Sequence, residues 1–168
     1  QNMQARLRGM LRMAFSNSNQ HLVLSTSNKS ESAIGYTTLY GDMCGGFAPI
    51  KDVPKTLVYA LARYRNTISH VIPERIITRP PSAELTHNQT DQDTLPDYPE
   101  LDRIIAYYMN EKLSIAEIIS KGHDAAVVKH IIKMIQKNEY KRRQAPLGTK
   151  ISHRAFGRDW RYPLTSKF

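Results

Sequence analysis

The sequence predicts part of an α/β domain that binds an anionic ligand. Three observations support this fold class: a strand-length apolar run at residues 21–26, amphipathic helical segments around it, and a concentration of small polar residues and glycines at 25–56. Parallel sheets bury their strands under helices, so a short apolar run among helices is typical of such a domain. Ligands of α/β sheets bind at the carboxyl ends of the strands, where this polar stretch begins.

The first part of the chain alternates helices with extended segments. Apolar residues recur at helical spacing over residues 4–16, which predicts a helix with one apolar face. The strand at 21–26 is followed by a predicted helix at 30–37 and a glycine-rich loop at 41–49. The loop has neither dinucleotide-binding nor Walker spacing, so by itself it is weak evidence for a ligand.

Aspartate and proline residues mark the next elements. Asp52 is a good N-cap, with Pro54 just inside, for a helix that ends near residue 65. Residues 70–85 contain three prolines and are predicted to be extended. Residues 86–97 are polar, which indicates a loop.

The second half of the chain is predicted to be helical. Asp97 is the N-cap of a helix over 98–111, Ser114 and Glu117 form a capping box for a short helix, and Asp124 caps a longer one. The apolar stripe of that longer helix is predicted to lie in the core; it consists of Val127, Val128, Ile131, Ile132 and Ile135.

The overall composition limits the possible function classes. The 168 residues correspond to one domain or to part of a larger one, and the absence of a long apolar run argues against a membrane span. The single cysteine, Cys44, cannot form an internal disulfide, which is consistent with a reducing cytoplasm. No metal-ligand spacing and no Ser-His-Asp or Cys-His arrangement is readable, so no catalytic side chain is predicted.

The polar stretch contains the first candidate binding residues. The Thr26 hydroxyl is suited to a base or ribose, and the Glu31 carboxylate to a ribose hydroxyl or a metal ion. Glu31 could equally complete a capping box with Ser27 or Asn28 as the N-cap. Lys55 stands at a helix start, where it can reach an anion or remain exposed to solvent.

Two further candidates lie downstream. Ser82 follows two prolines in an extended turn and is suited to a phosphate contact, with ordinary loop structure as the alternative. The net charge of +9 is concentrated near the C-terminus, where Lys141, Arg142 and Arg143 suit a polyphosphate or a nucleic-acid backbone. A solvated helix end is the alternative for this charge run.

Five stretches together resemble the synthetase domain of glutamine-dependent NAD⁺ synthetases. They occur in the family's order and cover most of the chain: "QNMQARLRGMLRMAFSN", "STSNKSESAIGYTTLYGDMCGGFAPIKDVPKT", "IPERIITRPPSAEL", "LPDYPELDRII" and "NEYKRRQAPLGTKISHRAFGRDWRYP". Leu39 and Gly46 match the glutamine-dependent branch and differ from the ammonia-dependent one. The resemblance implies an adenine-nucleotide α-hydrolase-like (Rossmann-like) parallel sheet with helices, of which residues 1–168 form the C-terminal part.

The resemblance also implies a reaction. ATP adenylates the nicotinate carboxylate of deamido-NAD⁺, and ammonia obtained from glutamine displaces AMP to give NAD⁺. Mg²⁺ and lysines are expected to offset the phosphate charge. Matching positions imply ATP contacts by Thr26, Lys55 and Ser82, deamido-NAD⁺ contacts by Asn2, Arg6, Glu31 and Lys141, and a metal contact by Glu31.

The resemblance implies partners as well. The family's pyrophosphate-binding "SGGxDS" loop and its nitrilase-like glutaminase domain are absent from this sequence, which begins at Gln1 without an initiator methionine. We therefore expect an upstream part of the same enzyme as a partner, little or no activity from this chain alone, and association into a homo-oligomer. No membrane and no nucleic acid are expected as partners.

Two other functions remain as alternatives. One is another amidating ligase of the same ATP-pyrophosphatase class, which would bind a different acid. The other is a basic nucleic-acid-binding module, whose affinity would fall steeply with salt. The sequence contains no usual recognition helix or base-stacking platform, and this argues against the second alternative.

Overall fold

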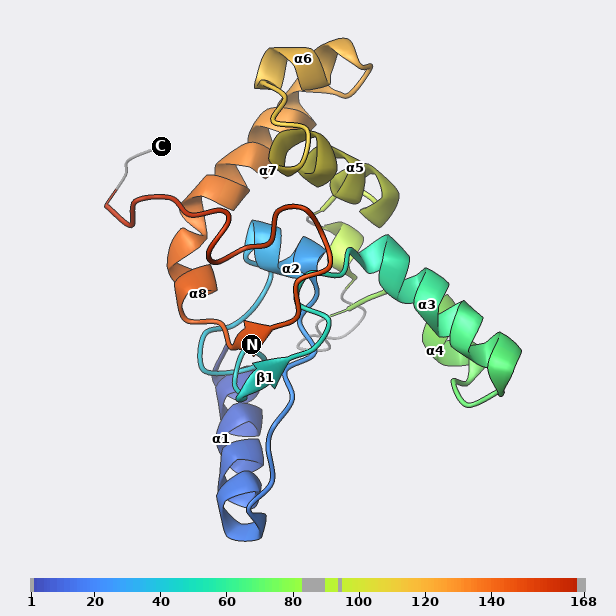
Figure 1. Cartoon of the computed structure of the whole chain (residues 1–168), viewed down its shortest axis with the longest axis vertical. Coiled ribbons are helices and arrows are strands. Elements are labelled where there is room, and N and C mark those ends of the chain that lie inside the picture. The colour runs from blue at the N-terminus through green and yellow to red at the C-terminus, as the bar shows by residue number, and fades with distance from the viewer. Residues whose placement is uncertain (1, 83–89, 94, 166–168) are drawn as a thin grey trace.

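The computed structural model describes residues 2–82, 90–93 and 95–165. Helices dominate these residues (Figure 1). In chain order they are α1 (Asn2–Asn19), α2 (Lys29–Ile34), α3 (Lys55–Ile68), α4 (Glu74–Thr78), α5 (Tyr98–Met109), α6 (Ile115–Ser120), α7 (Ala125–Lys137) and α8 (Glu139–Arg143). A 3-10 turn at Asp91–Asp93 precedes α5, and the two strands are β1 (Phe47–Ala48) and β2 (Leu147–Gly148).

The sheet is small and its pairing is parallel. Phe47 of β1 pairs with Leu147 of β2, and an isolated parallel bridge joins Phe47 to Leu24. Only Leu24 of the predicted strand at 21–26 therefore pairs, and the prediction of a buried strand is wrong. The side chains of Leu22 and Leu24 are 67% and 53% exposed, because nothing in the described part of the chain covers them. The parallel direction agrees with the predicted α/β class.

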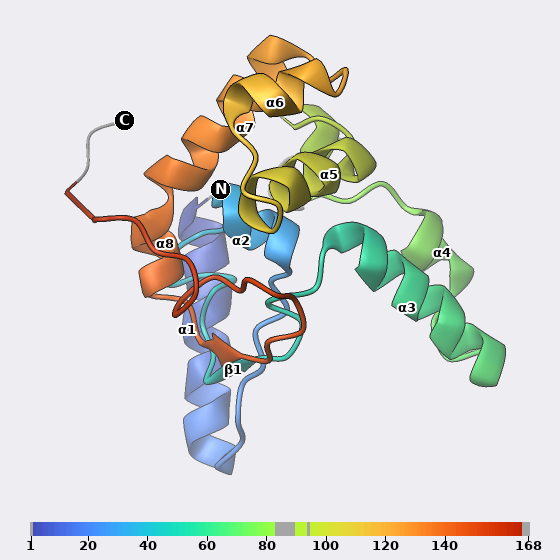
Figure 2. The same cartoon turned by 45° about the horizontal axis from the view of Figure 1, so that its top comes forward.

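The main hydrophobic core lies among α2, α5, α6 and α7, which pack together in the upper half of Figure 2. The predicted stripe of α7 is confirmed: Val128, Ile131, Ile132 and Ile135 are buried, and Val127 packs partly buried against the same cluster. Burying one such side chain contributes about 1.5–3 kcal/mol. The core therefore holds these four helices together.

The predicted helix starts of the second half are confirmed. The Asp97 carboxylate accepts a hydrogen bond from the Glu100 N–H at the start of α5. Ser114 and Glu117 form the predicted capping box of α6, and Asp124 caps α7. Each cap satisfies N–H groups that have no partner inside the helix, so these boundaries could be read from local chemistry.

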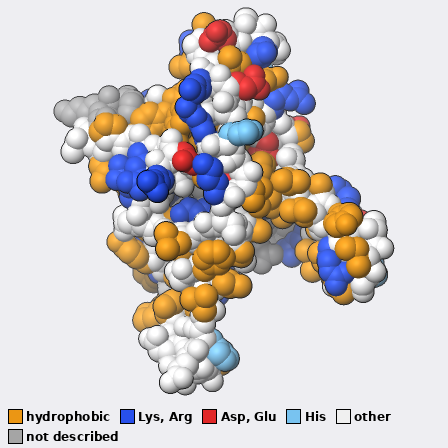
Figure 3. All heavy atoms as spheres, viewed as in Figure 1, with side chains coloured by type: hydrophobic (Ala, Val, Ile, Leu, Met, Phe, Trp, Pro, Cys, Tyr) orange, Lys and Arg blue, Asp and Glu red, His pale blue; other side chains and the backbone are white. Residues whose placement is uncertain are grey.

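The predicted first helix is confirmed as α1, but its apolar face lies in solvent. Leu7, Met10, Leu11 and Phe15 are between 50% and 70% exposed. The buried face consists of small residues such as Gly9, where an added Cβ would lie 2.7 Å from the Tyr40 carbonyl oxygen. The loop after α2 packs against this small-residue face. Hydrophobic side chains are visible near β1 and the upper part of α1 in Figure 3.

The sequence predicted that Asp52 caps α3, and this prediction is wrong. The helix starts at Lys55 with Pro54 in the N-cap position. The Asp52 carboxylate is instead buried, forms an ion pair with Lys29 at 2.8 Å, and accepts hydrogen bonds from the Ile151 and Ser152 N–H groups. A buried lysine requires a paired carboxylate, and this requirement overrides the local capping preference.

The prediction of extended structure over residues 70–85 is wrong in its middle. Helix α4 begins directly after Pro73, which is compatible with a helix start because the first helical N–H groups need no partner inside the helix. Residues 80–82 are not helical, and residues 83–89 lie outside the described residues. Helices α3 and α4 form an arm on one side of the molecule (Figures 1 and 2).

Among the described residues, no helix is both long enough and apolar enough to cross a bilayer.

Candidate functional site

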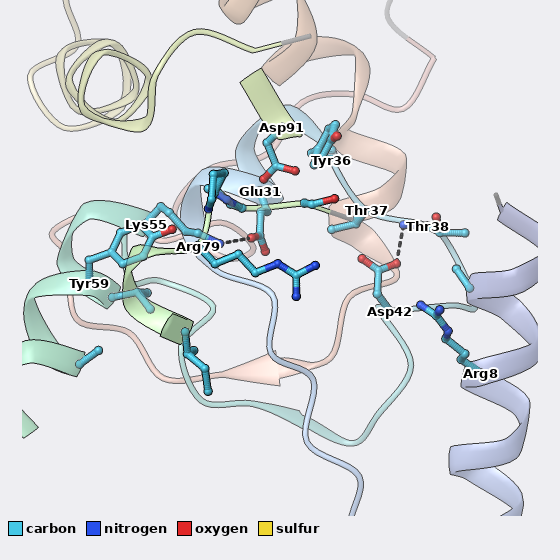
Figure 4. A pocket seen from close by; sticks show the side chains of 18 of the residues that line it. Arg8, Glu31, Tyr36, Thr37, Thr38, Asp42, Lys55, Tyr59, Arg79 and Asp91 are labelled. Atoms are coloured by element: carbon cyan, nitrogen blue, oxygen red, sulfur yellow. Dashed lines mark hydrogen bonds and ion pairs between the residues drawn. The ribbon is translucent and has the colours of Figure 1, made fainter. Parts of the chain in front are cut away.

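A cavity of about 860 Å³ lies between α1, α2, α3, α4 and the start of α8. Its polar and charged lining includes Asn2, Arg8, Arg12, Glu31, Tyr36, Thr37, Thr38, Asp42, Lys55, Tyr59, Arg79, Ser82, Asp91 and Lys141. Figure 4 labels ten of these residues. The volume is in the upper part of the range for small-molecule sites. Five of the described lining side chains are cationic and three are carboxylates, which favours an anionic ligand with a polar part.

The centre of the cavity wall is an ion pair between Glu31 and Lys55. The Lys55 Nζ lies 3.0 Å from the Glu31 Oε1 (Figure 4). Glu31 also completes the predicted capping box of α2, because its other carboxylate oxygen accepts the Asn28 N–H. The capping and cavity roles of Glu31 are therefore compatible. One carboxylate oxygen of Glu31 serves the capping box, and the other pairs with Lys55.

Aromatic rings surround the Lys55 ammonium group. Its Nζ lies 5.3 Å from the centre of the Tyr98 ring and 6.0 Å from that of Tyr59. Burial by itself lowers the pKa of Lys55, but the charge of Glu31 and its hydrogen bond outweigh burial and raise the pKa above its usual value. Lys55 is thus held as a fixed positive charge on the wall, as a phosphate-binding lysine requires.

Lys141 enters the cavity from α8. Its Nζ donates hydrogen bonds to the carbonyl oxygens of Gly35 and Thr37 at 2.7 Å and 2.8 Å. Burial lowers the pKa of Lys141, and the nearby Asp42 carboxylate opposes that shift. The alternative of a solvated helix end is therefore wrong for Lys141, which ties α8 to the turn after α2.

Asp42 faces the same region from the loop after α2. Its Oδ1 accepts a hydrogen bond from the Thr38 N–H at 2.6 Å. Asp42 keeps an exposed surface but lies among packed protein atoms, and the resulting loss of hydration raises the pKa of its carboxyl group. The Thr38 N–H, Lys141 and Arg12 act in the opposite direction. Asp42 therefore adds a second carboxylate to the cavity lining beside that of Glu31.

Arg142 is structural, although the sequence suggested that it suits a polyphosphate. It is 5% exposed, pairs with Glu139 at 3.1 Å and donates to the Ala33 carbonyl oxygen at 2.7 Å. Its donors are used inside the fold. Arg143 pairs with the same Glu139 at 2.8 Å and keeps part of its side chain exposed.

The structure brings together five of the seven predicted site residues. The cavity is lined by Asn2, Glu31, Lys55, Ser82 and Lys141. Thr26 is not among its lining residues and lies exposed beyond the Leu24 bridge. Arg6 projects from α1 toward a second hollow, where its Nε donates to the Leu39 carbonyl oxygen at 3.2 Å.

The sequence analysis missed several lining residues. Arg8 and Arg12 are four residues apart on α1, and Tyr59 follows Lys55 by four residues on α3, so each pair shares one helix face. That spacing was available as a signal. Arg79 and Asp91 carried no such signal, because their places depend on how α4 and the segment before α5 fold back against α2.

The carboxylates of the cavity fit one mode of Mg²⁺ binding. Within the described residues, no group of three or more His, Cys, Asp or Glu side chains could hold a metal ion. Mg²⁺ commonly uses one or two carboxylates together with substrate phosphates and water. Glu31 can supply such a carboxylate, and the phosphates would have to come from a bound nucleotide.

Parallel pairing of short strands, surrounding helices and a cation-lined cavity together indicate part of an α/β domain. The chain belongs to the NAD synthase family, whose family model matches residues 1–145. Its fold is accordingly part of an adenine-nucleotide α-hydrolase-like fold, that is, of a Rossmann-like parallel sheet with helices.

Named relatives agree with this family. The chain is 63% identical to a glutamine-dependent NAD(+) synthetase of Aquifex aeolicus and 58% identical to one of Acinetobacter baylyi. The matches cover 100% and 99% of this chain but 30% and 31% of those proteins. The chain thus spans about a third of the length of the relatives it matches.

Solved structures show the same likeness. The chain is similar to a glutamine-dependent NAD(+) synthetase from Cytophaga hutchinsonii with a TM-score of 0.71, 25% identity, and coverage of 98% of this chain and 28% of that one. It is also similar to an NMN synthetase from Francisella tularensis, with a TM-score of 0.68, 27% identity, and coverage of 83% and 52%.

Proposed function

We propose that this chain supplies part of the ATP and deamido-NAD⁺ site of a glutamine-hydrolysing NAD⁺ synthase, a ligase of NAD biosynthesis that forms a C–N bond. The observation that supports this most strongly is the cavity around the Glu31–Lys55 pair, in which five residues that the family resemblance assigns to these substrates lie together. Its size suits a nucleotide, and its cations suit phosphates.

Each residue has a chemical part in the proposal. Lys55 offsets phosphate charge on ATP, and Ser82 donates its hydroxyl hydrogen to the same nucleotide. Asn2 and Lys141 hold deamido-NAD⁺, and Arg6, which is on α1 with Asn2, contacts the same substrate. Glu31 lies at the junction of the two substrates. Thr26, which follows the parallel bridge at Leu24, contacts ATP.

Adenylation explains why such a site is needed. A nicotinate carboxylate is a poor electrophile because it is already negative, and joining it to AMP supplies a leaving group for ammonia. Mg²⁺, when bound through Glu31 and the nucleotide phosphates, supplies positive charge to the transferring group. Fixed cations such as Lys55 act in the same direction without needing to move.

We further propose that residues 1–168 form the C-terminal part of the synthetase domain, that this domain works in the cytoplasm, and that it acts together with an upstream pyrophosphate loop and glutaminase domain of the same enzyme. The relatives it matches are more than three times as long, which supports such a partner. Association with a second copy is part of the proposal. The chain alone is expected to have little or no activity, because residues 1–168 contain no "SGGxDS" loop, whose backbone N–H groups would hold the β- and γ-phosphates.

The test is formation of AMP and NAD⁺ from ATP, Mg²⁺, deamido-NAD⁺ and ammonium. The full-length protein that contains residues 1–168 is expected to form both products, and Lys55→Ala is expected to lower kcat/KM by about 100-fold or more. Lys150→Ala is the control, because Lys150 is 53% exposed and pairs only with Asp159 in the described structure. Equal activity of the two variants would contradict the proposed role of Lys55.

A second candidate is an amidating ligase of the same class that acts on a mononucleotide. The similarity to the Francisella tularensis NMN synthetase favours it. The two candidates differ in substrate size, so the assay is repeated with the deamido mononucleotide in place of the dinucleotide. A higher kcat/KM for the mononucleotide would replace the first proposal with this one.

A further inference from the structure

The first turn of α3 is capped by residues from two other helices. The N-cap residue is Pro54, which makes no side-chain hydrogen bond to the helix. Ser30 Oγ of α2 accepts the Lys55 N–H at 2.8 Å. Asp102 Oδ2 of α5 accepts both the Thr56 N–H at 2.9 Å and the Thr56 hydroxyl at 2.8 Å. Two N–H groups that would otherwise lack partners are therefore satisfied from outside the helix.

A single carboxylate connects all three helices. The Ser30 hydroxyl donates its own hydrogen to Asp102 Oδ1 while its oxygen accepts the Lys55 N–H. Ser30 is 1% exposed, so this hydroxyl cannot exchange its partners for water. The negative charge of Asp102 also lies at the positive end of α3, where it is favourable. Asp102 thus fixes α2 and α3 relative to each other.

The capped backbone is adjacent to the cavity side chains. Ser30 precedes Glu31, and the N–H that Ser30 holds belongs to Lys55 itself. The side chains of Glu31 and Lys55 meet at 3.0 Å on the cavity wall, whereas neither Ser30 nor Asp102 is among the lining residues. Asp102 therefore does not touch the cavity and can affect its side chains only through Ser30 and Thr56.

We propose that Asp102 is a positioning residue, which acts through Ser30 and Thr56 to hold Lys55 beside Glu31 for an anionic ligand. The placement of Lys55 follows from contacts within this chain, whereas the identity of the ligand rests on the proposed function. A displacement of about 1 Å at a reacting or binding group is enough to cost about 100-fold in rate. Asp102 is accordingly expected to influence ligand binding without touching the ligand.

The first experiment measures the position of Lys55 without any ligand. Lysines are acylated by a small reagent at one pH, and the labelling rate of Lys55 is compared with that of the other lysines by mass spectrometry. Asp102→Ala is expected to raise the Lys55 rate at least about threefold, because the ammonium group is released from its ion pair. An unchanged Lys55 rate in a folded Asp102→Ala protein would overturn the proposal.

Asp124→Ala is the matched control. Asp124 caps α7 by the same chemistry, accepting the Ala126 and Val127 N–H groups, and is not among the residues that line the cavity. Each variant removes a carboxylate that accepts backbone N–H groups at a helix start, but only Asp102→Ala is expected to change Lys55. If Asp102→Ala does not fold, Ser30→Ala removes the same link with a smaller change and is held to the same expectation.

The second experiment measures ATP affinity in the full-length protein. Asp102→Ala is expected to raise the Kd at least about tenfold over the wild type, and Asp102→Asn less, because the amide oxygen still accepts the Thr56 N–H. A Kd equal to that of Asp124→Ala would overturn the inference. If Lys55 labelling responds but the wild type binds no ATP, the positioning stands and the proposed function fails.

Discussion

Helices α7 and α1 have the same kind of apolar stripe in the sequence and opposite surroundings in the structure. In α7 the stripe residues Ile131 and Ile132 are at most 1% exposed, because α2, α5 and α6 cover them. In α1 the stripe residues Leu7 and Leu11 are 50% and 70% exposed. The buried face of α1 is made of small residues instead.

The difference shows what periodicity can predict. An apolar repeat at helical spacing identifies a helix, because the spacing follows from the backbone geometry. It does not identify the partner that covers the apolar face, since that partner lies elsewhere in the sequence or outside the chain. Four predictions test this difference between the well-packed core side and the exposed α1 side.

The largest effect is expected at the buried ion pair on the core side. Replacing Asp52 by alanine leaves Lys29 buried without its carboxylate and releases the Ile151 and Ser152 N–H groups. We expect the free energy of unfolding to fall by about 3–5 kcal/mol. Urea unfolding monitored by circular dichroism measures it. As a control, Asp159→Ala breaks a surface pair and is expected to have little effect; an equally small loss for Asp52→Ala would contradict the buried role.

The second prediction compares the two helical regions directly by the same substitution. Leu101 of α5 is 0% exposed and Leu11 of α1 is 70% exposed. Leu101→Ala is expected to cost about 3 kcal/mol through lost burial and a residual cavity, and Leu11→Ala about 0.5 kcal/mol or less. Both values come from urea midpoints at one protein concentration. A large loss for Leu11→Ala would indicate that α1 is covered in solution.

The third prediction concerns acid. Burial by itself raises the pKa of Asp52, but the Lys29 ammonium and the Ser152 and Ile151 N–H groups outweigh burial and lower the pKa below its usual value. A carboxyl group whose folded pKa is lowered contributes its full stability above the unfolded pKa of about 4, and this contribution is lost as the pH falls through the folded pKa. Between pH 5 and 2, the unfolding free energy of Asp52→Asn is therefore expected to fall less steeply than that of the wild type. Parallel curves would show that Asp52 is not responsible.

The smallest effect is expected at the turn between α5 and α6. Lys112 has a φ of +59°, a backbone conformation that costs conformational energy in any residue with a Cβ. Lys112→Gly is expected to stabilise the protein by up to about 1 kcal/mol, measured as a rise in the urea midpoint. Lys121→Gly serves as the control, since the φ of Lys121 is −79° and glycine there has no strain to relieve.

Local chemistry made much of the fold predictable. The caps at Asp97, Ser114 and Asp124 and the α7 stripe were readable because each depends on neighbours within about four residues. The role of Asp52 was not readable, because its partner Lys29 and the N–H groups that it accepts come from distant segments. Helix α4 was missed because Pro73 was read, together with the two later prolines, as part of an extended segment, whereas it directly precedes the helix.

The candidate site divides in the same way. Glu31 and its capping box follow from a four-residue pattern, and Lys55 follows from its place at a helix start. Their contact at 3.0 Å depends on Ser30 and Asp102, which no local pattern connects. The contact of Lys141 with Gly35 and Thr37 likewise spans about a hundred residues and required the structure.

The central claim is that the cavity around Glu31 and Lys55 binds the nucleotide substrates. Hydrogen–deuterium exchange on the full-length protein, with and without saturating ATP, Mg²⁺ and deamido-NAD⁺, tests it most directly. We predict slower exchange of the backbone amides at residues 29–38, in the first turn of α3 and around Lys141, and unchanged exchange in α6, which lies away from the cavity (Figure 1). Unchanged exchange at 29–38 and at Lys55 under conditions where NAD⁺ is formed would contradict the account.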